Sequence, residues 1–295
     1  MAADEQRLRV AVLGAGLVGV DLADKIRQSE KLELALVAGR DRDSLGLLRA
    51  AEMGHPTTAG GIRAVVDAGP FDVVFDATNA DSHAEHWAAL RPIGTTLIDL
   101  TPTELGTVIV PGVNSHRSAA YRHVNLVSCG GQAAIPVLYA ISKRCTPTYI
   151  EVVSTGASAS AGRATRLNLD QYITTTSAAI RTFTGTRDVK VMVNLSPARP
   201  APPFRVAMTV LAEGIRSAPV RTSIAAAAQA VCAYTPGFKV TSLVVGARRI
   251  SVAVEVTASG GRLPRHAGSV DIINAAAVLL AEQSAAASRR RESHP

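Results

Sequence analysis

Aromatic side chains are scarce in this chain of 295 residues, of which they make up 4%. Proteins that bind single-stranded nucleic acid stack bases on aromatic rings, so this mode of binding is not expected. The net charge is +7, and apart from the run at 289–291 the Lys and Arg residues are scattered. A DNA-binding groove would gather them in a stripe. The surplus is either a solvated basic surface or an attraction for a phosphorylated cofactor.

Cysteine is also rare, and its three positions are 129, 145 and 232. Three cysteines cannot form a disulfide framework, and this spacing fits no zinc pattern, so we expect no metal. No apolar run reaches the ~18 residues of a membrane span, and the first residues lack the apolar core of a signal peptide. We therefore expect a cytoplasmic protein with reduced thiols and no membrane partner.

The first part of the chain alternates between strand-like and helix-like segments. The length of the whole chain, 295 residues, predicts two domains, since a domain takes roughly 100–200 residues. Alternation of strands and helices is typical of a parallel sheet with crossover helices, so residues 1–130 are predicted to form a Rossmann-type α/β domain. The expected strands are 8–13, 32–37, 71–75, 96–100 and 124–127, and the expected helices are 20–29, 44–53 and 82–91.

The second part, residues 131–266, has a different pattern that predicts an α+β domain with a mixed or antiparallel sheet. Two alternating segments on either side of Gly246 indicate a hairpin. A last apolar helix is expected at 270–283, and residues 284–295 are expected to be a flexible tail. The expected strands are 149–154, 190–195, 206–211, 238–245 and 249–257, with an Ala-rich helix at 222–234.

A glycine-rich loop joins the first expected strand to the first helix. Its pattern is G-x-G-x-x-G, which in this context indicates dinucleotide binding. The first glycine permits a tight turn, the second admits the pyrophosphate, and the third lets helix and strand pack closely. The predicted cofactor-binding residues of this loop are Gly14, Ala15, Gly16, Leu17, Val18 and Gly19.

The segment after the second strand should choose between NAD and NADP. An acidic residue there would hold the ribose hydroxyls of NAD, and an arginine would accept the 2′-phosphate of NADP. The sequence offers Arg40 and Asp41 together. Arg40 follows the strand end directly, which slightly favours NADP, and Asp41 keeps NAD open.

The most informative segment surrounds Cys129, which follows a strand and precedes an apolar helix. A thiol at a helix N-terminus is expected to have a lowered pKa and to be nucleophilic. Gly130 and Gly131 are expected to give a substrate carbonyl access and to leave free N–H groups for an oxyanion. Cys129 is therefore the predicted nucleophile.

Several motifs together resemble the acylating acetaldehyde dehydrogenases, enzymes that are often partners of 4-hydroxy-2-oxovalerate aldolase. The similarity runs from about residue 8 to residue 281, and the layout resembles the aspartate-semialdehyde dehydrogenases more distantly. The motifs that carry the resemblance are GAGLVG, DATNADSH, LIDLTP, VPGVN, NLVSCGGQAAIP, SAGRATRLNLDQY, TTTSAAI and HAGSVDIINAAA.

The resemblance implies that the Cys129 thiolate attacks an aldehyde, that hydride passes to NAD or NADP, and that coenzyme A takes the acyl group from the resulting thioester. It implies that the helix at 267–283 completes the dinucleotide-binding domain, and that 131–266 serves catalysis and homodimerisation. A second cofactor-contacting loop would contain Ser160, Gly162, Arg163, Thr165, Arg166 and Asn168, and a late motif adds Ser269.

The chain departs from the family pattern at the pocket loops. Arg163 and Ala164 replace Pro and Gly, and Met208 aligns with an acid that is thought to activate the thiol. His266 replaces a tyrosine, and Ser269 replaces an asparagine that contacts the cofactor. Either His266 has become the base, or it is a rim residue and Cys129 relies on the helix dipole.

We therefore expect an NAD(P)-dependent oxidoreductase that interconverts an aldehyde and an acyl thioester of CoA or of a carrier protein. The altered loops and the inclination to NADP suggest a reductive, biosynthetic direction. One alternative is a phosphorylating semialdehyde dehydrogenase, against which the CGGQA motif argues. Another is a catalytically weakened nucleotide-binding partner of an aldolase, against which the retained Cys129 argues.

Overall fold

The computed structural model describes residues 7–260 and 262–292, without the side chains of 163, 164 and 287–292. Its described residues form two compact units. Unit 1 comprises residues 7–109, 114–126 and 277–292, and unit 2 comprises residues 110–113 and 127–276. The predicted fold class is confirmed, because one unit holds a parallel sheet and the other a mixed sheet.

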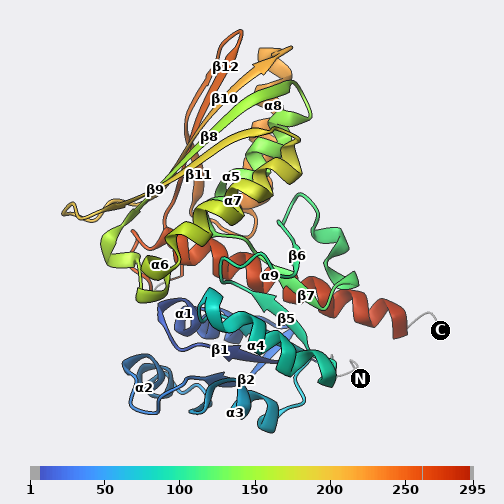
Figure 1. Ribbon diagram of the computed structural model, residues 1–295, viewed down its shortest axis with the longest axis vertical. Coiled ribbons are helices and arrows are strands. Elements are labelled where there is room, and N and C mark those ends of the chain that lie inside the picture. Colours follow the sequence, from blue (N-terminus) through green and yellow to red (C-terminus); the bar gives the residue numbers. More distant parts are fainter. Residues whose placement is uncertain (1–6, 261, 293–295) are drawn as a thin grey trace. The chain divides into compact units, whose positions relative to one another are not determined.

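In the described part of unit 1, seven parallel strands follow the order β3-β2-β1-β4-β5-β7-β6 (Figure 1). The central strands are apolar runs, as expected where helices cover both faces of a parallel sheet. The strands are β1 (Leu8–Leu13), β2 (Leu32–Ala38), β3 (Thr57–Thr58), β4 (Val73–Asp76), β5 (Thr96–Asp99), β6 (Thr107–Val108) and β7 (His123–Asn125).

The crossover helices of unit 1 bury their apolar stripes against this sheet. Ile62 and Val65 of α3 and Leu90 of α4 belong to one buried cluster with Ala11 and Val74 of the strands. Helix α3 was not among the helices expected from the sequence, and it has only eight residues. The helices are α1 (Leu17–Arg27), α2 (Leu45–Glu52), α3 (Gly61–Ala68) and α4 (Ala80–Leu90), with 3-10 turns η1 (Arg91–Ile93) and η2 (Ser115–Ala120).

In unit 2, the described residues form a five-stranded sheet in the order β11-β12-β10-β8-β9. Strands β8 and β9 are parallel and the other neighbours are antiparallel, so the sheet is mixed. The hairpin predicted around Gly246 is confirmed as the pair β11–β12. The strands are β8 (Thr146–Ala157), β9 (Asp188–Ser196), β10 (Phe204–Glu213), β11 (Phe238–Val245) and β12 (Arg249–Val256).

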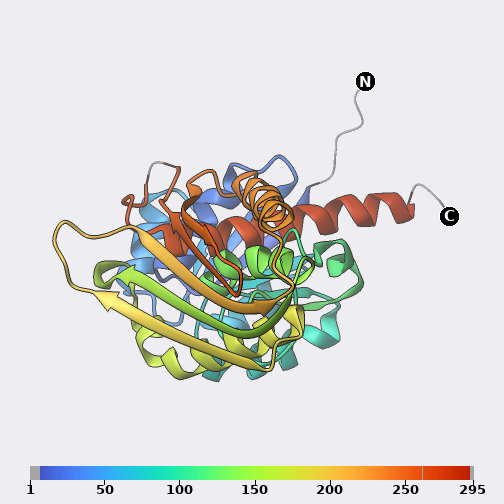
Figure 2. The ribbon, with the colours of Figure 1, turned by 90° about the horizontal axis from the view of Figure 1, so that it is seen from above.

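Helices α5 (Cys129–Ser142), α7 (Leu169–Thr184) and α8 (Ser217–Cys232) cover one face of this sheet (Figures 1 and 2). Strand β10 shows the alternation that this requires, with Val206 and Met208 buried and Arg205 and Ala207 exposed. Ser154 of β8 pairs with Val206 and is buried as well, so it lies on the helix-covered face. The 3-10 turn η3 (Ser158–Ser160) and the short α6 (Arg163–Leu167) precede α7.

The last helix, α9 (Gly268–Glu292), is longer than expected. The sequence predicts a flexible tail from residue 284, whereas the helix continues to residue 292, because Ala and Arg dominate this segment and are strong helix formers. Residues 293–295 of the predicted tail lie outside the described residues. No helix of the described chain combines the length and apolar character of a membrane span.

Candidate active site

The glycine-rich loop of unit 1 has the shape that the sequence predicts. Gly14 has a φ of +107°, and a Cβ there would lie 2.6 Å from the carbonyl oxygen of Ala77. A Cβ on Gly19 would overlap the carbonyl of Gly14, which explains the close packing of α1 on β1. Gly16 precedes α1, and a Cβ at this position would meet no atom within 4 Å outside the adjacent residues. The loop is therefore open where a pyrophosphate would meet the helix N-terminus.

Arg40 and Asp41 are both exposed in the turn after β2. One carboxylate oxygen of Asp41 accepts a hydrogen bond from the backbone of Asp43 at 3.1 Å, which fixes the turn. No described protein side chain pairs with the Arg40 guanidinium, so it can meet a phosphate from solvent. The structure thus offers the arginine and the carboxylate in one place, as the sequence does.

A strained turn presents Cys129 in unit 2. Val127 has a φ of 65°, which is unfavourable for a β-branched residue. The hydroxyl of Ser128 then caps α5 by accepting a hydrogen bond from the N–H of Gly131 at 2.9 Å. Cys129 is the first residue of α5 and is half-buried. Strain of this kind is concentrated at functional sites, so the turn supports a functional role for the thiol.

The hydroxyl of Tyr172 lies beside Cys129, although no local pattern in the sequence indicates this contact. Tyr172 lies in the first turn of α7, and its hydroxyl oxygen is 3.7 Å from the Cys129 Sγ. It accepts a hydrogen bond from the N–H of Gly130 at 2.9 Å and donates one to the Ser154 Oγ at 3.3 Å. A Cβ on Gly130 would overlap both hydroxyl oxygens, so this position needs glycine.

Two expectations about the thiol are wrong. The N–H groups of Gly130 and Gly131 are not free for an oxyanion, because the hydroxyls of Tyr172 and Ser128 accept from them. Burial raises the pKa of the Cys129 thiol, despite hydrogen bonding from Tyr172 and from the backbone N–H groups of Gly130 and Cys129. Burial therefore opposes the acidity that was expected from the helix N-terminus.

The predicted second loop leads from η3 through α6 into α7, which carries Tyr172. Arg166 folds back, donating to the carbonyl oxygen and the hydroxyl of Ser158, both at 2.9 Å. Ser160 is buried, and its hydroxyl has no partner in the described part of the chain. Gly162 and Thr165 are exposed and Asn168 is buried. The side chain of Arg163 lies outside the described residues.

His266 and Ser269 lie around the start of α9 and are partly exposed. No hydrogen bond among the described residues joins His266 to Cys129. Met208 is 1% exposed and lies on the sheet face that α5 covers, opposite Val152 of β8. An acidic side chain at position 208, as in the family pattern, would therefore lie on the face of the sheet that the helices cover.

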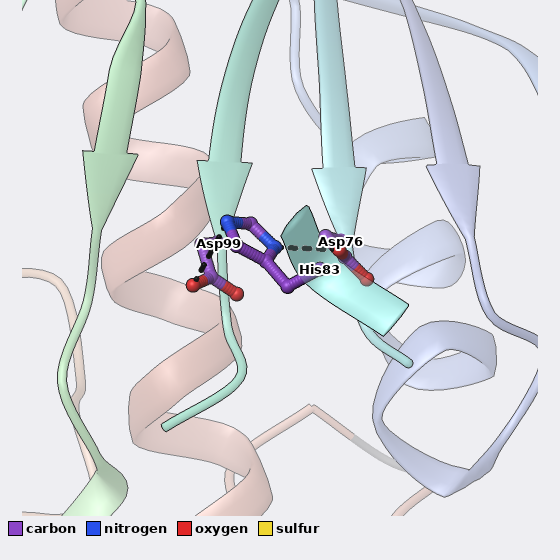
Figure 3. Close-up of side chains that lie close together, drawn as sticks. All are labelled: Asp76, His83 and Asp99. Carbon is purple, nitrogen blue, oxygen red and sulfur yellow. Dashed lines mark hydrogen bonds and ion pairs between the residues drawn. The ribbon is translucent and has the colours of Figure 1, made fainter. Parts of the chain in front are cut away.

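A buried polar cluster in unit 1 joins the carboxyl ends of β4 and β5 to α4 and to His123, the first residue of β7. His83 of α4 lies between the carboxylates of Asp76 and Asp99 (Figure 3). Its Nδ1 is 2.7 Å from Asp76, and its Nε2 is 2.8 Å from His123 Nε2 and 3.3 Å from Asp99. The Nδ1 of His86 also lies 2.8 Å from Asp76.

Histidines are the partners of the two buried carboxylates in this cluster. Burial alone would lower the pKa of His83. The hydrogen bond to Asp76 and the charges of the two nearby carboxylates outweigh burial and raise this pKa. Hydrogen bonds from His83 and His86 outweigh burial and hold the pKa of Asp76 well below its ordinary value. Burial raises the pKa of Asp99 to about 6, and burial with the charge of His83 lowers that of His123 to about 4. Since Asp76, His83 and Asp99 have atoms within 4.8 Å of one another, they could hold a metal, but the imidazole already bridges the carboxylates.

The raised pKa of His83 predicts that stability falls as the pH rises from about 6.5 through the pKa of His83 in the folded state. The folded state holds this proton more tightly than the unfolded state, whose histidines titrate near pH 6.5. The stabilisation is complete below that value and is lost as the pH rises through the folded pKa. The opposite effect of His123 is confined to about pH 4–6.5. Urea unfolding across this range should show the decline, and a constant or rising free energy of unfolding would contradict it.

Sequence models of two known families match the chain. One is described as "Prokaryotic acetaldehyde dehydrogenase, dimerisation" and matches residues 129–264. The other is described as "Semialdehyde dehydrogenase, NAD binding domain" and matches residues 9–120. The first match covers most of the unit with the mixed sheet, and the second covers most of the unit with the parallel sheet.

Similar whole proteins are also known. An acetaldehyde dehydrogenase of Streptomyces griseus is 49% identical, with 94% of this chain and 90% of that protein covered. One of Pectobacterium atrosepticum is 39% identical, with 94% and 95% covered. The crystal structure of aspartate semialdehyde dehydrogenase II from Vibrio cholerae, complexed with ASA, has a TM-score of 0.65 at 15% identity and covers 97% of this chain and 99% of that one. At this identity the structural likeness shows the shared fold.

Proposed function

Because this chain belongs to the acetaldehyde dehydrogenase family, we propose that it is an NAD(P)-dependent acylating aldehyde dehydrogenase, which interconverts an aldehyde and an acyl-CoA through a thioester on Cys129. The observation that carries the proposal is the placing of Cys129. A strained residue, Val127, precedes the capped start of α5, and a buried hydroxyl lies 3.7 Å from the thiol. An inert core cysteine needs neither feature.

The chemistry of the proposed reaction begins on the sulfur. The Cys129 thiolate attacks the aldehyde carbon, a C–S bond forms, and the carbonyl electron pair moves to oxygen. A nicotinamide bound in unit 1 would supply the acceptor for the hydride that this carbon loses, and the carbon would then remain on Cys129 as an acyl thioester. The thiolate of coenzyme A attacks the thioester and releases the Cys129 thiolate. The same steps in reverse reduce an acyl-CoA. The covalent thioester divides one difficult step into two easier ones.

The dinucleotide fits unit 1 at the loop around Gly16. The open space beside Gly16 admits a pyrophosphate, and the N-terminus of α1 would face its charge. We propose that the second loop and Ser269 also contact the cofactor. The buried hydroxyl of Ser160, which has no partner among the described residues, supports a polar ligand at that loop.

Arg40 supports a preference for NADP over NAD. An arginine–phosphate contact of this kind contributes roughly 1.5–3 kcal/mol, so Arg40→Ala should raise the KM for NADPH by about 10-fold or more and leave that for NADH within about 2-fold. Arg42→Ala, two residues on in the same exposed turn, is the matched control. Steady-state kinetics with both cofactors measure the effect. An equal change for NADH and NADPH would remove the assignment.

His266 is the candidate base that the sequence supplies, and its role is testable by alkylation. If it takes the Cys129 proton, His266→Asn should slow alkylation by iodoacetamide at pH 7 by at least about 10-fold. His116→Asn, an exposed histidine of η2, is the control. Met208→Asp in the His266→Asn background should restore part of the rate. If His266→Asn reacts at the wild-type rate between pH 5 and 9, His266 is not the base.

We also propose a homodimer through unit 2, since the family description of residues 129–264 names dimerisation and the helices leave one face of the sheet uncovered. Light scattering at micromolar concentration would show it, and a monomer would contradict it. An aldolase partner and a reductive, biosynthetic direction are further proposals, which rest on the family and on Arg40.

The proposed activity is tested by following NADH and NADPH oxidation with a panel of acyl-CoAs that includes acetyl-CoA. We expect CoA-dependent oxidation with release of an aldehyde, and release of free CoA in equal amount. Oxidation of an aldehyde that requires phosphate instead of CoA would favour the phosphorylating reaction. Absence of turnover with every acyl-CoA and every aldehyde would contradict the proposal.

A further inference from the structure

We propose that Tyr172 is a catalytic hydrogen-bond donor, whose hydroxyl stabilises negative charge first on the Cys129 sulfur and then on the oxygen of the tetrahedral adduct. The inference rests on the proposed function, because it assumes that Cys129 forms that adduct. It replaces the oxyanion site that the glycines were expected to provide.

The first argument concerns which donors remain near the thiol. An oxyanion needs N–H or O–H groups aimed at it. The hydroxyls of Tyr172 and Ser128 already accept from the N–H groups of Gly130 and Gly131. Ser128 is turned towards Thr176, at 2.7 Å. Beside the backbone N–H groups of Gly130 and Cys129, the O–H of Tyr172 is therefore the side-chain donor next to the Sγ.

The second argument concerns the direction of the Tyr172 proton. Because the oxygen accepts from the N–H of Gly130, that lone pair is occupied and the oxygen is held in place. The competing acceptor, the Ser154 Oγ, is 3.3 Å away, which is long for an O–H···O hydrogen bond. The proton is therefore held weakly and can turn to the Cys129 side.

The third argument is the reach of the hydroxyl. It lies 3.7 Å from the Sγ, a distance at which it can donate to a thiolate. The oxygen of the adduct would be two bonds from the Sγ, and the Tyr172 hydroxyl could reach it with a hydrogen bond. Burial and repulsion by the Cys129 thiolate raise the pKa of Tyr172 well above its ordinary value. The hydroxyl thus keeps its proton throughout: it donates a hydrogen bond, transfers no proton and exchanges no electrons.

The local sequence agrees with this arrangement. Because Gly130 has no Cβ, the hydroxyl oxygens of Tyr172 and Ser154 can lie close to its backbone; a Cβ there would overlap both. The hydroxyl of Thr176, one turn after Tyr172, donates to the Tyr172 carbonyl at 2.6 Å. Tyr172 is 7% exposed, so its ring is packed and its hydroxyl is fixed. A donor that is already in position needs no rearrangement when charge develops.

The test is Tyr172→Phe, which keeps the ring and removes the hydroxyl. Loss of one oxyanion donor lowers kcat by about 10²–10³-fold in enzymes of this kind of chemistry, and we expect a similar fall with the KM for the cofactor within about 3-fold. The pH midpoint of Cys129 alkylation by iodoacetamide should move upward, because the thiolate loses a donor. Tyr139→Phe, on α5, is the matched control for the substitution.

Two further variants separate a donor from a packing role. Ser154→Ala removes the competing acceptor and should keep the alkylation midpoint unchanged or move it downward. Incorporation of 3,5-difluorotyrosine at position 172 makes the hydroxyl more acidic at almost constant shape, and it should move the midpoint downward even if Tyr172→Phe fails to fold. An unchanged midpoint with difluorotyrosine, or alkylation and acylation of folded Tyr172→Phe within about 3-fold of wild type, would overturn the proposal. Alkylation needs no acyl-CoA, so the proposal can fail while the proposed function stands, and Cys129→Ala tests that function separately.

Discussion

Replacing Cys129 by alanine is expected to lower turnover by at least about 10⁴-fold, since removal of a covalent nucleophile eliminates the pathway rather than weakening it. Cofactor binding should stay within a few-fold of wild type, because the glycine-rich loop belongs to a separate unit of the structure. Turnover is measured by NADH oxidation with acyl-CoA, and cofactor binding is measured by the fluorescence of the cofactor.

Cys145→Ala is the control for this substitution. Cys145 follows α5, and its Sγ contacts the carbonyl of Ile141 at 3.5 Å, so this variant should keep turnover within a few-fold. If Cys129→Ala turned over at the rate of Cys145→Ala, the covalent mechanism would be excluded, and with it the role of Tyr172.

Replacing His83 by alanine is expected to destabilise the fold by roughly 3–5 kcal/mol at pH 7, the usual cost of removing one partner from a buried ion pair. The carboxylates of Asp76 and Asp99 are both fully buried. The ion pairs that the described residues make with them come from histidines, and no Lys or Arg replaces the lost charge. Urea unfolding at pH 7 measures the loss.

His116→Ala provides the comparison, because His116 is exposed in η2 and surface substitutions usually change stability by less than about 0.5 kcal/mol. Equal stability of the two variants would show that His83 is not the charge that holds the two carboxylates. A loss of cofactor affinity alone, without a change in unfolding, would point to a binding role for the cluster instead.

Local patterns predicted the parts of the molecule that depend on neighbouring residues. The strand before Gly14 and the helix after it follow from apolar periodicity and three glycines, and the hairpin around Gly246 follows from alternation. The start of α5 at Cys129 is also visible in the sequence, because a strand, a serine cap and an apolar run succeed one another. These features need no knowledge of tertiary packing.

Contacts between distant segments were not predictable in the same way. Tyr172 lies 43 residues from Cys129 and reaches it only because α7 packs against α5. One tyrosine among five carries no local sign of such a contact. The acidity of the thiol was misjudged for the same reason, since the helix N-terminus is read from the sequence but burial is not. The bridge from Asp76 through His83 to Asp99 likewise depends on two neighbouring strands ending at the same edge of the sheet.

The covalent thioester is tested most directly by mass spectrometry of the wild-type protein. The protein is mixed with acetyl-CoA in the absence of a reduced cofactor, digested at low pH, and each cysteine-containing peptide is weighed. The account predicts one acetyl group, on Cys129, which disappears when NADH or NADPH is added. An acetyl group on Cys145 or Cys232 instead, or an unmodified Cys129 in a preparation that turns over acetyl-CoA, would contradict it.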